Sequence, residues 1–157
     1  MNLVFAEMFI ASYGLPIDFT ASITYGWKLG RKLCLATGFI LTPSGTVSIL
    51  TLAALSLQRY LTIVNPDRFK VTSYKSSFMI IAGIWIYTMF IAVPPFFGFG
   101  AYVPETSGMT CAPDWESNKH IIFTIYWLFT GFLIPLVVII FSSYKTVLSL
   151  KEVSSSH

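Results

Sequence analysis

Few residues in this chain are of types that do chemistry, and none stands in a familiar catalytic arrangement. The two histidines, His120 and His157, are isolated, so no spacing typical of a metal site occurs. The sequence contains no Gly-rich phosphate loop, no nucleophile elbow and no paired catalytic acids. It therefore predicts neither an enzyme nor a metal centre.

One acid and one base stand out because they interrupt or end apolar runs. Glu7 lies inside the first run, and an acid in the hydrocarbon region costs roughly 2.5 kcal/mol or more. It therefore faces either a polar interior or the nearby inner interface, and both interpretations stay open. Arg59 ends the second run, where a lone cation is usually an anchor at the water interface.

The composition indicates that these residues belong to a membrane protein. The chain is 55% hydrophobic and 11% charged, with a mean hydropathy of +0.71. A soluble domain carries about 25% charged residues, so a surface this poor in charge would not be solvated. The net charge of +3 is too small and too dispersed to indicate a nucleic-acid partner.

Four apolar segments have the length of membrane spans, and we predict them at about 1–22, 33–60, 76–97 and 120–144. An uncharged run from Leu33 to Gln58 exceeds the roughly 30 Å of a bilayer's hydrocarbon core at about 1.5 Å per residue. A long outer loop is expected at 98–119. The predicted fold is all-α, a membrane helical bundle in one domain over residues 1–157.

The distribution of Lys and Arg predicts which side of the bilayer holds the two ends. With four spans, both ends lie on one side, and cytoplasmic loops carry more Lys and Arg. The side of the ends carries Arg59, Arg68, Lys70, Lys75, Lys145 and Lys151, and the other side carries Lys28, Arg31, Lys32 and Lys119. We therefore expect both ends in the cytoplasm.

This orientation places the two cysteines on the outer side of the membrane. Cys34 opens the second span and Cys111 lies in the outer loop. Two cysteines in an oxidising compartment are expected to form a disulfide, and the alternative is a pair of unrelated thiols.

Several motifs occur in one order along the chain. Asn2-Leu3 with Ala6-Glu7 is followed by Gly26-Trp27-Lys28-Leu29-Gly30 and Cys34, then by Gln58-Arg59-Tyr60, Trp85, Pro94-Pro95, Gly98, Ala101-Tyr102-Val103-Pro104-Glu105, Thr110-Cys111 and Pro135. In this order and spacing the chain resembles the middle of a class A (rhodopsin-like) G-protein-coupled receptor, and within that class an opsin. The resemblance covers the second to fifth transmembrane helices, which implies a partial chain of a seven-helix receptor.

The resemblance has two departures of note. Glu7 stands where the family's second helix usually carries Asp, and Gln58 stands where an acid normally pairs with the arginine. The seventh-helix lysine that holds retinal covalently lies outside the matched segment.

The resemblance also implies roles for individual residues. Gln58, Arg59 and Tyr60 would contact a heterotrimeric G protein, and Glu105 would be the counterion of the retinal Schiff base, because Thr37 at the family's other counterion position does not ionise. The implied retinal pocket consists of Thr37, Gly38, Thr42, Gly45, Thr46, Tyr102, Trp115, Trp127 and Phe132. Taken singly, each of these is more simply a packing residue. Arrestin, a receptor kinase and the lipid bilayer are the further implied partners.

Two other functions stay open. A class A receptor for a non-retinal ligand would lack the seventh-helix lysine. A four-span membrane scaffold or transport subunit would have no hydrophobic span upstream in its transcript.

Overall fold

The computed structural model describes residues 2–65 and 74–155, with side chains as far as residue 151. Arg68 and Lys70, which contribute to the predicted orientation, lie outside these described residues, as does His157.

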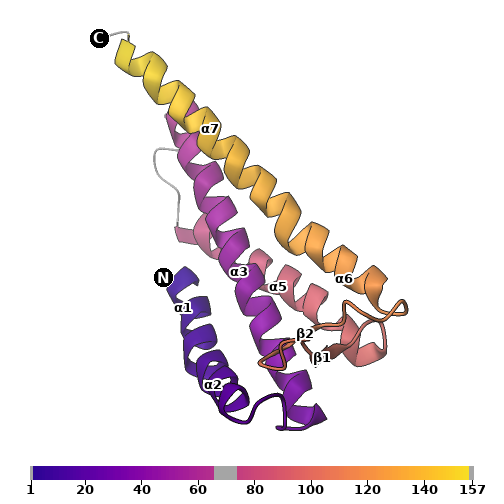
Figure 1. Cartoon of the computed structure of the whole chain (residues 1–157). Coiled ribbons are helices and arrows are strands. Elements are labelled where there is room, and N and C mark those ends of the chain that lie inside the picture. Colours follow the sequence, from indigo (N-terminus) through magenta and orange to yellow (C-terminus); the bar gives the residue numbers. More distant parts are fainter. Residues whose placement is uncertain (1, 66–73, 156–157) are drawn as a thin grey trace.

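Within the described ranges, the chain forms four long helical segments (Figure 1). The first comprises α1 (Asn2–Phe9), the π-helical turn η1 (Ile10–Gly14) and α2 (Leu15–Ile23), and the second is α3 (Arg31–Val64). The third is α5 (Tyr74–Ala92), followed by the 3₁₀ turn η2 (Pro94–Phe97). The fourth comprises α6 (Ile121–Leu128), the π-helical turn η3 (Phe129–Leu133) and α7 (Ile134–Ser155).

Helix α3 is the central element, because α1, α5 and α7 all pack against it. Its buried face is rich in small and hydroxyl-bearing residues, which allow close helix approach in a membrane. The hydroxyls are largely satisfied within the helix: Ser44 donates to the Ile40 carbonyl at 2.7 Å and Thr51 to that of Val47 at 2.7 Å. This leaves a polar but hydrogen-bonded seam through the centre of the bundle.

A short hairpin covers the N-terminal end of α3. Strand β1 (Tyr102–Pro104) pairs antiparallel with β2 (Cys111–Pro113), with Tyr102 opposite Pro113. Cys111 of β2 forms a disulfide with Cys34 of α3, across a Cα–Cα distance of 5.4 Å. The predicted disulfide is therefore confirmed, and it holds the hairpin on the helix.

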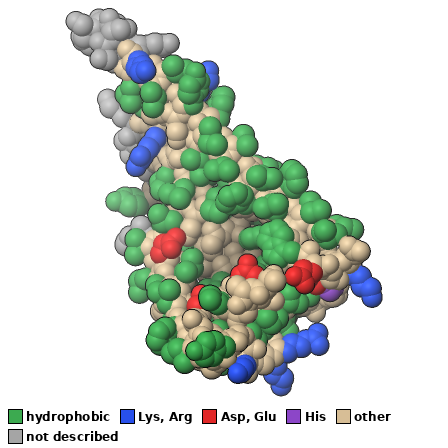
Figure 2. Space-filling view, in the orientation of Figure 1, with side chains coloured by type: hydrophobic (Ala, Val, Ile, Leu, Met, Phe, Trp, Pro, Cys, Tyr) green, Lys and Arg blue, Asp and Glu red, His purple; other side chains and the backbone are tan. Residues whose placement is uncertain are grey.

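The exterior is that of a membrane protein. Four segments, Asn2–Ile23, Arg31–Val64, Tyr74–Phe97 and Ile121–Lys151, are long and apolar enough to span a bilayer. In Figure 2, hydrophobic side chains are spread over the visible face, and the Lys and Arg side chains lie toward its two ends. The all-α membrane bundle is confirmed, whereas the side of the bilayer that each end faces stays a prediction.

Candidate functional site

The hairpin reaches the bundle interior through Tyr102. Its ring lies against Gly38 of α3, so closely that a Cβ at Gly38 would be 2.4 Å from the ring's Cδ1. The hydroxyl donates to the Ala92 carbonyl at 3.2 Å. Burial raises the pKa of Tyr102 to about 12, although a hydrogen bond with the Thr42 side chain acts in the opposite direction. Tyr102 is therefore a neutral, fixed side chain that joins the hairpin, α3 and the end of α5.

A second contact joins α3 to α6 one turn deeper in the bundle. Trp127 donates from Nε1 to Oγ1 of Thr46 at 3.3 Å, and Thr46 donates in turn to the Thr42 carbonyl at 2.8 Å. The Trp127 ring meets Trp115 edge to face, with ring centroids 6.3 Å apart. Gly131 lies beside this indole, because a Cβ there would be in ordinary van der Waals contact with it at 3.4 Å.

These contacts bring together most of the predicted pocket residues. Gly38, Tyr102, Thr42, Thr46, Trp127 and Trp115 form one continuous chain of neighbours. The remaining three differ in their surroundings: Thr37 is buried, the Cβ position of Gly45 meets no atom within 4 Å, and Phe132 is 39% exposed. The candidate pocket is thus a partly open wall of aromatic and hydroxyl side chains.

Glu105 lies at the exposed end of the hairpin. Its carboxylate accepts a hydrogen bond from the Ser107 hydroxyl at 3.4 Å. Its backbone N–H donates to the Thr110 carbonyl at 2.9 Å, which closes the turn between the strands. In the described residues, therefore, Glu105 faces its own turn.

Asp114 is a structural residue that the sequence analysis missed. Its Oδ1 accepts the backbone N–H groups of Glu116 and Ser117, both at 3.1 Å. Its Oδ2 lies 2.9 Å from Nδ1 of His120, and its carbonyl accepts from Thr124 at 2.8 Å. The hydrogen bond with His120 is the main cause that lowers the pKa of Asp114. An Asp just ahead of a helix start is the sequence signal for such a turn, because its side chain can accept hydrogen bonds from the backbone N–H groups that follow it.

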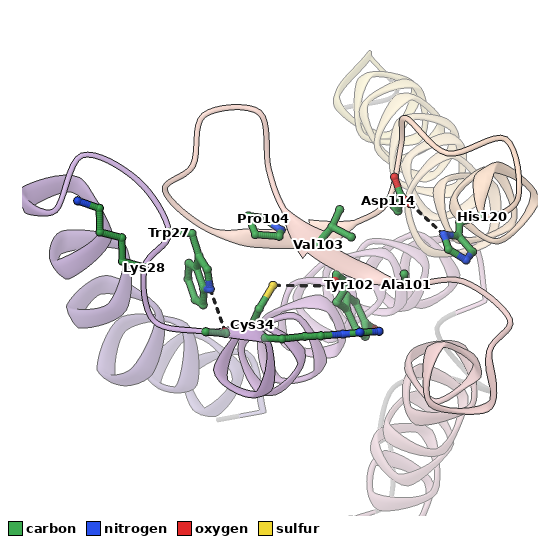
Figure 3. A pocket seen from close by; sticks show the side chains of 11 residues that line it. Trp27, Lys28, Cys34, Ala101, Tyr102, Val103, Pro104, Asp114 and His120 are labelled. Atoms are coloured by element: carbon green, nitrogen blue, oxygen red, sulfur yellow. Dashed lines mark hydrogen bonds and ion pairs between the residues drawn. The ribbon is translucent and has the colours of Figure 1, made fainter.

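A cavity of about 520 Å³ lies between this turn and the N-terminal end of α3 (Figure 3). Trp27 and Lys28 line one side of it, and Asp114 with His120 lines the other. Trp27 is held in place by its Nε1, which donates to the Gly30 carbonyl at 3.1 Å.

The predicted G-protein-contacting residues lie at the opposite end of α3. Gln58 and Arg59 are exposed and Tyr60 is partly buried. Gln58 and Arg59 line a second cavity, of about 600 Å³, together with Thr146 and Leu150 of α7. The groove between α3 and α7 is thus open where those residues lie.

Glu7 faces α3. Its Oε1 accepts a hydrogen bond from Ser48 at 2.7 Å. Nearby, Asn2 donates to Thr51 and accepts from Nε1 of Trp85, both at 2.9 Å. The contact with Ser48 favours the interpretation in which the Glu7 carboxylate serves a polar interior.

Comparison with known proteins shows which receptor family and which relatives the chain is similar to. The family described as "7 transmembrane receptor (rhodopsin family)" matches residues 1–157. Pineal opsin of Petromyzon marinus is 32% identical over 159 residues, which cover 99% of this chain and 36% of the relative. Rhodopsin of Rana temporaria is 32% identical over 156 residues, covering 97% of this chain and 44% of the relative.

A solved structure shows the same arrangement of helices. The crystal structure of squid rhodopsin superposes with a TM-score of 0.84 at 28% identity, over 96% of this chain and 44% of that one. The chain thus spans less than half the length of each of these relatives.

Proposed function

Because the chain belongs to the rhodopsin family of seven-transmembrane receptors, we propose that it is the second-to-fifth-helix part of a light-sensing opsin, in a single receptor domain over residues 1–157. Such a receptor binds retinal and activates a heterotrimeric G protein. The predicted resemblance to opsins is confirmed by the relatives, and the family is one of receptors rather than enzymes. Retinal binding and G-protein activation are our proposal.

The observation that carries this proposal is the continuous contact from Gly38 through Tyr102, Thr42 and Thr46 to Trp127. Retinal is a long apolar polyene, and aromatic faces beside small residues suit such a ligand. The wall lies against the outer half of α3 and is open on one side, as Trp115 at 48% exposed illustrates. The residues present therefore fit the ligand, which would supply the light-driven isomerisation when bound.

Each part of the chain has a distinct role in this proposal. Tyr102 and the disulfide-linked hairpin cover the outer end of the pocket, and Thr37, Gly45 and Phe132 complete its lining. Glu105 contributes negative charge from the outer loop. Gln58, Arg59 and Tyr60, at the end of the groove between α3 and α7, contact the G protein, and arrestin and a receptor kinase use the same side.

The test uses the receptor that contains this chain together with its remaining helices. The receptor is expressed, incubated with 11-cis-retinal and purified, and both its absorption spectrum and its light-dependent nucleotide exchange on a G protein are measured. We expect a visible band and exchange that depends on light. Trp127→Ala should reduce pigment yield, whereas Phe141→Ala, an exposed position on α7, should not.

A receptor that is folded but forms no visible band would contradict the proposal. If that receptor also lacks a seventh-helix lysine, the alternative of a class A receptor for another ligand replaces it.

A further inference from the structure

Asp18 is an acid whose role in the bundle is unexplained. It lies in α2, inside the candidate span Asn2–Ile23. Its Oδ1 is buried and has no hydrogen-bond partner. Within the ranges that the structure describes, the one ion pair joins Asp114 and His120. A buried carboxylate oxygen without a partner is costly in a membrane span, which favours a partner for Oδ1 of Asp18 from outside the described residues.

The buried stripe of α2 gives the direction in which Asp18 projects. Gly14 and Ala21 are buried, and Asp18 lies four residues after one and three before the other, on the same face of the helix. Gly14 lies against α3, because a Cβ there would be 3.0 Å from Cδ2 of Leu41. The Asp18 side chain is half-buried overall, so its buried Oδ1 lies on the side of the helix that faces α3.

Contacts deeper in the bundle show which residue of α3 lies at the same depth as Asp18. Asn2 bonds to Thr51 and Glu7 to Ser48, and Gly14 then meets Leu41. The helices are antiparallel, so residue numbers that increase along the first segment lie beside residue numbers that decrease along α3. One further turn on each helix brings Asp18 to the level of Thr37.

Thr37, like Asp18, has a buried side-chain oxygen without a hydrogen-bond partner. The residue is 0% exposed, and its Oγ1 is buried without a hydrogen-bond partner. In the described part of the chain, one other side-chain atom, Oγ of Ser142 on α7, shares this condition. Two unsatisfied oxygens therefore occur at one depth on facing helices, in the outer part of the bundle. A carboxylate beside a hydroxyl suits a cation that donates N–H bonds.

The basic residues nearby do not supply this cation. Lys28, Arg31 and Lys32 are all exposed at the outer end of the bundle. Glu105 is also exposed and bonds to Ser107 in its own turn. We infer that Asp18, assisted by Thr37, is the main anion that holds a buried cation between α2 and α3, and that this cation is the protonated nitrogen through which retinal is held. The inference rests on the proposed function.

The test measures the pKa of that nitrogen from the change of the absorption band with pH, in the whole receptor reconstituted with retinal. An opposite charge at contact distance shifts a pKa by about one to three units, a ten- to thousandfold change in the protonation equilibrium. Asp18→Asn should lower the pKa by that amount and move the band to the ultraviolet near neutral pH. Added chloride should partly restore the visible band. Glu116→Gln, the control at another exposed acid of this loop, should leave the pKa unchanged. A larger decrease in Glu105→Gln than in Asp18→Asn would assign the counterion to Glu105 and overturn the inference.

The unfolding temperature of the retinal-free receptor separates charge pairing from a structural role. If Asp18 acts as the anion, Asp18→Asn leaves that temperature unchanged or raises it. The retinal-free receptor lacks the protonated retinal nitrogen, so the substitution breaks no ion pair with it. A lower unfolding temperature in the retinal-free Asp18→Asn receptor overturns the inference. A pKa of the nitrogen equal to that of the parent receptor overturns it as well.

Two further outcomes are decisive. If Asp18→Asn yields no pigment, a visible band in Asp18→Glu, which keeps the carboxylate, supports the inference, and loss of pigment in both variants overturns it. A parent receptor that forms no pigment overturns the proposed function as well, whereas a normal parent pigment with an unaffected Asp18→Asn variant overturns this inference alone.

Discussion

Replacement of Gly38 by Ala tests the contact that seats the outer hairpin on α3. The added Cβ would lie 2.4 Å from Cδ1, 2.5 Å from Cγ and 2.9 Å from Cβ of Tyr102. The ring is buried and bonded through its hydroxyl to Ala92. The strand that carries it pairs with β2, and β2 is disulfide-bonded to Cys34, one turn from Gly38. Tyr102 therefore has no free direction in which to move.

The free energy of this change has three contributions. Overpacking of a tight contact costs about 1 to 3 kcal/mol, and displacement of the ring loses a hydrogen bond worth about 0.5 to 1.5 kcal/mol. Ala in place of Gly within a helix returns up to about 1 kcal/mol. With the full return of about 1 kcal/mol, the net expectation is destabilisation by about 0.5 to 3.5 kcal/mol.

Gly45 provides a matched control on the same helix. No atom lies within 4 Å of its Cβ position, so Gly45→Ala should be neutral or slightly stabilising in this helix. The assay is thermal unfolding of the whole receptor in detergent, for both single variants and for Gly38→Ala combined with Tyr102→Ala. The double variant should show that most of the Gly38→Ala penalty disappears once the ring is absent. Equal stability of the Gly38→Ala and Gly45→Ala variants would refute the reasoning.

Three further predictions concern the disulfide, the inner end of α3 and the Asp114 turn. Cys34→Ser removes a link between residues 77 apart in sequence and should lower stability by about 4 to 5 kcal/mol in the chain-entropy model, and it should make the hairpin susceptible to protease; unchanged proteolysis would argue against a stabilising link. Gln58→Glu supplies a charge-assisted bond about twice as strong as a neutral one, so it should lower nucleotide exchange in the dark, and an unchanged or higher dark rate would place the resting-state contact elsewhere. The pKa of Asp114 is lowered in the folded state, so its stabilising contribution is complete above the ordinary Asp pKa of about 3.9 and is lost as the pH falls through the lower folded value. Asp114→Asn should therefore weaken the decrease in unfolding temperature between about pH 5 and about pH 2, and a parallel decrease in both proteins would contradict this assignment.

Sequence and structure agree most closely where a property depends on composition or on chain order. Hydropathy indicated four spans, and the two cysteines on one side of the membrane indicated a disulfide, which the structure contains. The order of the motifs indicated the receptor family. Hydropathy was less informative about helix ends: α7 continues to Ser155, beyond the predicted end of the fourth span at 144. Apolarity reports the depth of the bilayer, whereas a helix continues wherever its backbone hydrogen bonds do.

The direction in which each side chain points was decided by tertiary structure alone. Gly38 and Gly45 are equivalent in the sequence, yet one lies against a tyrosine ring and the other faces open space. Asp18 and Asp114 are the same residue type in the sequence, but one has a buried oxygen without a partner and the other closes a turn around His120. Hydropathy is a property of one residue and its neighbours in sequence, so it determines that a helix lies in the membrane. The rotation of that helix depends on contacts with segments far away in the chain, and those contacts exist only once the bundle has packed.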